Sequence, residues 1–157
     1  MTVTAYTHLS ITVSDLEAAR RYYVDGLGFK QVTETGRVSG ELGEKAAQLL
    51  ELDEFDGRTT KLERDGQILA LWEYAKPAPV TGTRQPMNLC GPSHLCFLVQ
   101  DIDEVARTLE ALGGTTLHGT RISTDLPDGK PRTYMLCLAP DAAVRIELIE
   151  TDGLPNT

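Results

Sequence analysis

Two stretches of the chain show the same order of hydrophobic patterns. Residues 7–13 (THLSITV) alternate between apolar and polar side chains, which predicts a short strand. Residues 15–28 then carry apolar side chains at helical spacing and end at a glycine, which predicts an amphipathic helix. The same succession returns in residues 93–99 (SHLCFLV) and 101–114. The pattern therefore predicts a strand followed by a helix in each half of the chain.

The spacing of single residues supports an internal repeat. Each half starts with a strand histidine, His8 or His94. In both halves an aspartate follows seven positions after the histidine, and a glycine follows twenty positions after it. An aspartate at that point can cap the free N–H groups of a helix. We therefore expect a duplicated structural module.

Three strand-like segments follow the helix in each half. They are FKQVTET, RTTKLERDG and QILALWEY in the first half, and TTLHGTRIS, RTYMLCLAP and VRIELIE in the second. Each half is thus a β-α-β-β-β module, over residues 5–75 and 92–151, with a proline-rich linker at 76–91. An extra helix is predicted at about 40–52, where it packs over the module edge or forms a lid over a pocket. Its expected apolar stripe consists of Leu42, Ala46, Leu49 and Leu50.

Composition and charge narrow the class of protein. The 157 residues carry a net charge of −8, which disfavours binding to nucleic acid and to anionic membranes. No apolar run is long enough for a transmembrane helix. The N-terminus lacks the features of a signal peptide, and the three cysteines form no CxxC pair. We therefore expect a cytoplasmic protein with reduced thiols.

The duplicated plan resembles the vicinal oxygen chelate superfamily. That group includes glyoxalase I, methylmalonyl-CoA epimerase, extradiol dioxygenases, fosfomycin-resistance transferases and bleomycin-binding proteins. The resemblance covers about residues 5–151 and is carried by HLSITVSDLEAARRYYVDGLGF, GPSHLCFLVQDIDEVARTLEALGG and APDAAVRIELIE. It implies an α+β fold of two tandem β-α-β-β-β modules, whose strands form an open, cup-like mixed sheet as in glyoxalases.

The resemblance also implies metal ligands on the first and last strands of each module. His8, His94 and Glu147 match three of the four ligand positions. Superimposing QILALWEY on VRIELIET places Ala70 at the fourth position, and alanine cannot coordinate a metal. Glu73 lies three residues further on, which is the opposite face of a regular strand. A bulge in the strand would be needed to make Glu73 a fourth ligand or a base.

Two histidines and one carboxylate form a chemically meaningful donor set. Three protein ligands leave coordination positions open for a substrate or water. A 2-His-1-carboxylate set with open positions is typical of non-haem Fe(II) oxygenases. Because Mn, Ni, Co and Zn also accept nitrogen and oxygen ligands, we expect a divalent metal ion without specifying which of these five it is. The alternative is a metal-free cup in which the same side chains only form hydrogen bonds.

Several other side chains are candidates for the pocket. Arg132 and Tyr134 lie two positions apart on one strand, so they share a face. There they would clamp an anionic group and donate to a substrate oxygen, or be a rim arginine and a packed tyrosine. Trp72 shares the face of the alanine at the fourth ligand position. Glu150 is a solvated carboxylate, an orienting group or a base, and His118 is expected at the surface.

The resemblance leaves three functions open. The first is a glyoxalase-like or epimerase-like isomerase or lyase, in which a metal chelates vicinal oxygens of a small substrate and stabilises an enolate. Glu147, Glu73 or Glu150 would take the proton. The second is an Fe(II) extradiol-type dioxygenase, which the three-ligand set supports. The third is a metal-free protein that binds an antibiotic or natural product. We rank the isomerase or lyase first and expect a homodimer.

Overall fold

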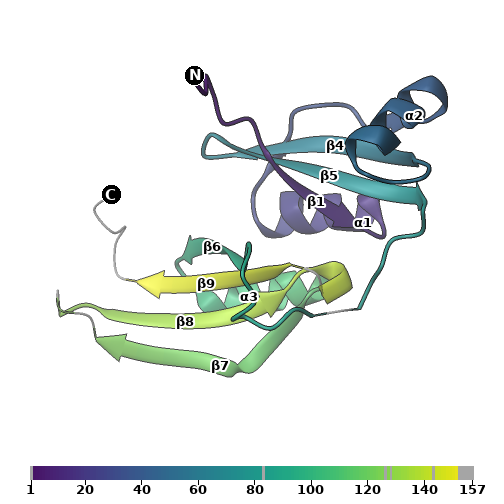
Figure 1. Ribbon diagram of the computed structural model, residues 1–157. Coiled ribbons are helices and arrows are strands. Elements are labelled where there is room, and N and C mark those ends of the chain that lie inside the picture. Colours follow the sequence, from purple (N-terminus) through teal and green to yellow (C-terminus); the bar gives the residue numbers. More distant parts are fainter. Residues whose placement is uncertain (1, 83, 126, 128, 143, 152–157) are drawn as a thin grey trace. The chain divides into compact units, whose positions relative to one another are not determined.

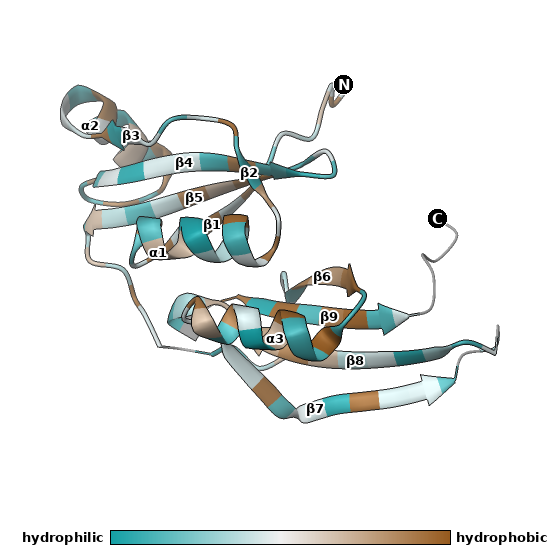
Figure 2. Cartoon of the chain, turned by 180° about the vertical axis from the view of Figure 1, so that it is seen from behind, coloured by the Kyte–Doolittle hydropathy of each residue, from teal (hydrophilic) through white to brown (hydrophobic). Residues whose placement is uncertain are grey.

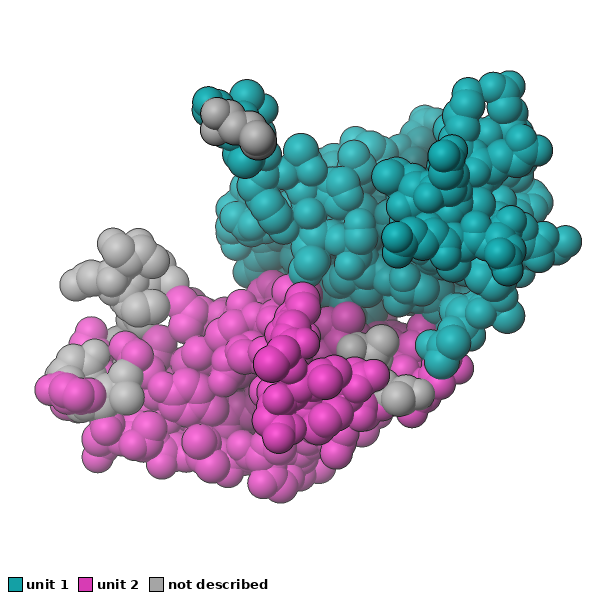
Figure 3. Space-filling view, viewed as in Figure 1, with its two compact units in different colours: residues 1–80 teal, residues 81–157 magenta. Residues whose placement is uncertain are grey.

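The structure is a computed structural model that describes residues 2–82, 84–125, 127, 129–142 and 144–151. The chain divides into two compact units, Met1–Val80 and Thr81–Thr157, which Figure 3 shows in different colours. The division falls inside the segment expected to be a linker. None of the helices in the described ranges is long and apolar enough to cross a membrane.

The first unit contains a mixed sheet with strand order β1-β5-β4-β2, in which β3 also pairs with β4 (Figure 1). The central β5 runs parallel to β1 and antiparallel to β4. The strands are β1 (Leu9–Val13), β2 (Lys30–Gln31), β3 (Gly36–Val38), β4 (Asp56–Arg64) and β5 (Gln67–Lys76). His8 therefore lies immediately before the first residue of β1.

One face of this sheet is covered by α1 (Leu16–Arg21) and the π-helical turn η1 (Tyr22–Gly26). Leu16 and Tyr23 on the helical side, and Leu69 and Leu71 on β5, are buried. The predicted cap is confirmed, because the Asp15 carboxylate accepts a hydrogen bond of 2.9 Å from the Ala18 N–H group.

The extra helix is present as α2 (Gly40–Leu49), but of the predicted apolar stripe only Ala46 packs against the buried cluster of Val38, Ala47 and Phe55. Leu42 and Leu49 are 58% and 82% exposed, while Gly43 and Ala47 are the buried residues of α2. The reason is a close approach to the backbone, since a Cβ atom on Gly43 would lie 2.5 Å from the Phe55 carbonyl oxygen. A glycine thus sets which side of the helix faces the sheet.

The second unit contains a four-stranded sheet with order β6-β9-β8-β7. Strands β6 and β9 are parallel, and the other pairs are antiparallel. The elements are β6 (His94–Val99), α3 (Ile102–Ala111), β7 (Thr115–Asp125), β8 (Pro131–Leu138), the 3₁₀ turn η2 (Pro140–Ala142) and β9 (Arg145–Thr151). Helix α3 covers one face, where Ile102, Leu109 and Ile146 are buried. Both α1 and α3 carry hydrophobic and hydrophilic residues, as Figure 2 shows.

Strand register confirms the alignment of the two halves. Leu69 pairs with Leu9 on β1, and Ile146 pairs with Leu95 on β6. One position further on, Ala70 occupies in β5 the place that Glu147 occupies in β9. The α+β fold of two β-α-β-β-β modules is therefore confirmed.

Candidate functional site

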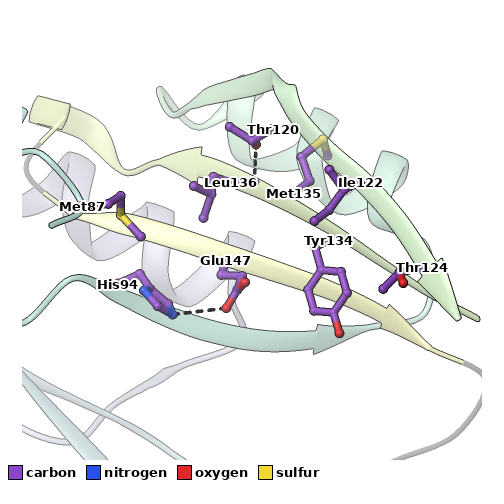
Figure 4. A pocket seen from close by; sticks show the side chains of 9 residues that line it. All are labelled: Met87, His94, Thr120, Ile122, Thr124, Tyr134, Met135, Leu136 and Glu147. Carbon is purple, nitrogen blue, oxygen red and sulfur yellow. Dashed lines mark hydrogen bonds and ion pairs between the residues drawn. The ribbon is translucent and has the colours of Figure 1, made fainter. Parts of the chain in front are cut away.

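A pocket of about 460 Å³ opens on the second unit, on the face of the sheet opposite α3. We call this the open face. Because Ile146 and Leu148 are buried on the side of α3, the alternation of β9 places Glu147 on the open face. The pocket is lined by Met87, His94, Thr120, Ile122, Thr124, Tyr134, Met135, Leu136 and Glu147 (Figure 4).

His94 and Glu147 meet at one end of this pocket. The His94 Nε2 atom lies 3.2 Å from the Glu147 Oε2 atom, and the two side chains are 31% and 26% exposed. They come from neighbouring parallel strands, which brings residues far apart in the sequence side by side. Two ligands at about 2.1 Å from one metal ion lie roughly 3.0 to 3.4 Å apart at octahedral or tetrahedral angles. The pair thus has the chemistry and the spacing of two metal ligands.

A hydroxyl group stands beside each of the repeat-equivalent histidines. The Ser93 Oγ atom lies 2.8 Å from Nδ1 of His94, and the Thr7 Oγ1 atom lies 3.0 Å from Nδ1 of His8. When Nδ1 is protonated and its N–H group donates a hydrogen bond to this hydroxyl, Nε2 keeps a lone pair that can bind a metal ion. Neither hydroxyl residue was predicted from the sequence, although each directly precedes its histidine in the repeat.

Cys96 is a further residue of the open face that the sequence analysis did not assign to the site. It pairs with Glu147 in the strand register and lies two residues after His94. Desolvation of the thiol, and then its hydrogen bond to the Glu147 carboxylate, raise the pKa of Cys96 to about 12. At neutral pH the thiol is therefore protonated, and its S–H group donates a hydrogen bond to the Glu147 carboxylate.

Glu73 and Glu150 lie on the helix-covered faces of their sheets, opposite to the faces of Ala70 and Glu147. The Leu16 N–H group donates to Glu73 Oε2, and the Ile102 N–H group donates to Glu150 Oε2, each over 2.7 Å. The register of β5 is regular from Leu69 to Glu73, so no bulge turns Glu73 to the other face. Both carboxylates stabilise the start of a helix.

Arg58 forms an ion pair with the same Glu73 carboxylate. Its guanidinium donates from Nη2 to Glu73 Oε2 over 2.7 Å and from Nε to Oε1 over 3.1 Å. The hydrogen bond from Arg58 lowers the pKa of Glu73, burial opposes this, and the Leu16 N–H group lowers the pKa further. The carboxylate therefore stays ionised and paired at neutral pH.

Replacing Glu73 by glutamine is expected to destabilise the first unit by about 1 to 2 kcal/mol at pH 7. The chain has a single tryptophan, Trp72, so urea unfolding followed by tryptophan fluorescence reports on this unit. Because the folded pKa of Glu73 is lowered, its contribution is present above the unfolded pKa and is lost as the pH falls through the folded pKa. The variant should lose that part of the acid dependence. Glu34→Gln, at an exposed position, is the control, and equal stability of both variants would contradict the prediction.

The remaining candidates occupy different places. Tyr134 lines the pocket, and Arg132 shares its side of β8 two residues earlier. Trp72 lies in the first unit, where its ring packs edge-on against Phe55 with centroids 5.8 Å apart. His118 is exposed near Glu110, which confirms a surface histidine.

The segment expected to be a linker takes part in the site. Met87 lines the pocket, and the buried Arg145 donates a hydrogen bond to the carbonyl of Gln85. The alternation of β9 puts Arg145 on the open face with Glu147, but no pattern in the sequence signalled its contact with the linker. Within the described residues, no three His, Cys, Asp or Glu side chains are grouped closely enough to hold a metal ion, so His94 and Glu147 form a pair.

Solved structures of similar fold come from bacterial glyoxalase-related proteins. A glyoxalase family protein from Bacillus cereus superposes with a TM-score of 0.73 at 19% identity, covering 98% of this chain and 97% of that chain. A glyoxalase family protein from Enterococcus faecalis gives 0.56 at 24% identity, covering 96% and 100%. A glyoxalase-related enzyme from Fulvimarina pelagi gives 0.54 at 22% identity, covering 99% and 94%. These similarities agree on the fold.

Comparison of the sequence with family models and with curated proteins addresses which family the chain belongs to. A comparison with curated proteins finds no significant match. The family model described as Glyoxalase/Bleomycin resistance protein/Dioxygenase superfamily matches residues 5–130, which is most of the chain. The resemblance to the vicinal oxygen chelate proteins is thereby confirmed, and the chain belongs to the Glyoxalase/Bleomycin resistance protein/Dioxygenase superfamily.

Proposed function

We propose that this protein is a metal-dependent isomerase or lyase that binds two neighbouring oxygens of a small substrate. The observation that carries the proposal is the His94–Glu147 pair, with 3.2 Å between an imidazole nitrogen and a carboxylate oxygen at one end of a pocket. His8, at the equivalent position of the first unit, is the third ligand that the repeat supplies. A divalent Fe, Mn, Ni, Co or Zn ion would act as a Lewis acid and stabilise the negative charge that develops on the substrate oxygens.

The side chains around the pair have separate tasks in this proposal. The Glu147 carboxylate accepts the α-proton of the substrate, since Glu73 and Glu150 are engaged at helix starts. The Cys96 thiol, which donates to Glu147, orients that carboxylate. The uncharged side chains of the lining, Tyr134 among them, contact the carbon skeleton of the substrate.

One observation favours a second candidate function. Ala70 occupies the fourth ligand position, and Glu73 is held by Arg58 and the start of α1. A set of two histidines and one carboxylate is that of non-haem Fe(II) oxygenases. An extradiol-type dioxygenase is therefore the alternative within the same site.

Metal analysis of the full-length protein separates these functions. The untagged protein is purified without chelator under low oxygen, and its metal content is measured. Stoichiometric Mn, Co, Ni or Zn supports the isomerase or lyase, whereas stoichiometric iron together with oxygen uptake on catechols supports the dioxygenase. A protein that holds no metal and takes none up on titration would overturn both, and would be a binding protein for an antibiotic or natural product. A homodimer in the cytoplasm stays a prediction, and light scattering during gel filtration tests the dimer.

A further inference from the structure

We infer that the substrate carries an uncharged alkyl or aryl tail beside its two oxygens, and that Ile122 and Tyr134 form the subsite for this tail. The inference rests on the proposed function, because the His94–Glu147 end of the pocket is taken as the place of the oxygens. The proposed reaction defines only the two oxygens of the substrate, and the inference concerns the rest of that molecule.

The strand register separates the two ends of the pocket. Glu147 pairs with Leu136 on β8, whereas Tyr134, two residues away along β8, pairs with Ile149. Two residues of a strand span about 7 Å. The tyrosine ring and the Glu147 carboxylate therefore lie at different points along the same pocket, far enough apart for a small substrate to contact both (Figure 4).

An irregularity in β7 brings Ile122 to this second end. Leu117 pairs with Leu136, but Ile122 pairs with Tyr134, so β7 advances five residues while β8 advances two. The Thr120 hydroxyl fixes the bulge, because it donates to the Leu117 carbonyl over 2.7 Å and accepts from the Leu136 N–H group over 2.9 Å. Figure 1 shows β7 bending part-way along its length. Bulges commonly re-aim side chains beside binding sites, as this one does for Ile122.

The apolar atoms at this end are accessible to a ligand. Ile122 is 60% exposed, although it lines the pocket. A single exposed aliphatic side chain is ordinary on a protein surface, but Ile122 pairs with Tyr134 and shares a cavity with its ring, so the two side chains form an apolar subsite. Thr124 adds a hydroxyl group to this end, and a hydroxyl group carries no charge. The charged pair of the pocket thus lies at one end, and the uncharged tail binds at the other.

A homologous series of probes measures the subsite directly. Catechol, 4-methylcatechol, 4-ethylcatechol and 4-propylcatechol present the same two vicinal oxygens and are uncharged at pH 7. Their dissociation constants are measured by NMR titration under argon, with the full chain in its metal-free and Zn²⁺-loaded forms. We expect each added methylene to tighten binding about two- to fourfold in both forms. Equal affinity for all four catechols would overturn the inference.

Two variants locate the effect. Ile122→Ser and Tyr134→Ser should each reduce the gain per methylene to less than about 1.5-fold, since the tail then loses its apolar wall. Leu49→Ser, at an equally aliphatic and exposed position on α2 of the first unit, is the matched control and should keep the full gain. Circular dichroism verifies that all three are folded. An unchanged gain in both pocket variants would contradict the assignment of the subsite.

The two proposals fail in different ways. If the protein takes up no Zn²⁺ but the gain per methylene persists and depends on Ile122, the metal-dependent function is overturned and the tail subsite stands. If Zn²⁺ binds and tightens catechol binding by the same factor for every member of the series, the metal site is supported and the tail subsite is overturned.

Discussion

Replacing His94 or Glu147 by alanine is expected to weaken the binding of a divalent metal ion by about 100-fold or more, and the same holds for His8. The physical reason is the share that each ligand contributes. Structural zinc sites with four ligands have apparent binding free energies of about 10 to 16 kcal/mol, so one ligand accounts for roughly 3 kcal/mol. That energy corresponds to about two orders of magnitude in the dissociation constant. Competition of each variant with a chromophoric chelator for Zn²⁺ measures the change.

The control for this experiment is a carboxylate that the fold uses elsewhere. Glu150 is three residues from Glu147 on β9, but its carboxylate accepts from the Ile102 N–H group at the start of α3. Glu150→Gln should therefore keep the metal affinity of the unaltered protein within about twofold, since a strand places the two side chains on opposite faces. Full retention of metal by all three alanine variants would show that the assignment of the ligands is wrong.

The alternation of the strands explains why the His94–Glu147 pair could be anticipated. Within a regular strand each residue changes face, so the buried Ile146 and Leu148 fix the direction of Glu147. The family resemblance pointed to the first and last strands of the module, and the register of β6 with β9 in the structure brings the two residues together. The same alternation put Glu73 on the face opposite to Ala70. It did not reveal that the carboxylate caps a helix, because that contact depends on where α1 starts in space.

The parts of the site that could not be predicted depend on irregular backbone. The bulge of β7 breaks the alternation between Leu117 and Ile122, so periodicity no longer indicates which face Ile122 occupies. Met87 reaches the pocket from a segment expected to be a linker, where no period exists to interpret. The packing of α2 was also not predictable from periodicity. The spacing of Leu42 and Leu49 predicted a buried stripe, but both are exposed, because the helix packs through the close backbone approach at Gly43.

A second glycine in the first unit has the largest expected effect on stability. Gly57 lies on β4, where the register with β5 shifts between residues 56 and 57. A Cβ atom at this position would lie 2.4 Å from the Glu73 carbonyl oxygen and 2.8 Å from the Phe55 ring. Gly57→Ala is therefore expected to lower the free energy of unfolding by about 2 to 4 kcal/mol, because the nearer of the two contacts is with backbone that cannot turn aside. Urea unfolding followed by the fluorescence of Trp72 measures the loss.

The neighbouring β3 offers a matched substitution that separates this clash from the general preference against glycine in strands. Gly36 pairs with Thr59 on the same β4, and a Cβ atom there would meet nothing within 4 Å. Alanine at position 36 should leave stability unchanged or raise it by up to about 1 kcal/mol, since alanine loses less backbone freedom on folding than glycine. Similar unfolding midpoints for Gly36→Ala and Gly57→Ala would mean that β4 and β5 move apart at little cost. A large loss confined to Gly57→Ala would instead show that the two strands, with Phe55 packed beneath α2, form a rigid part of the first unit.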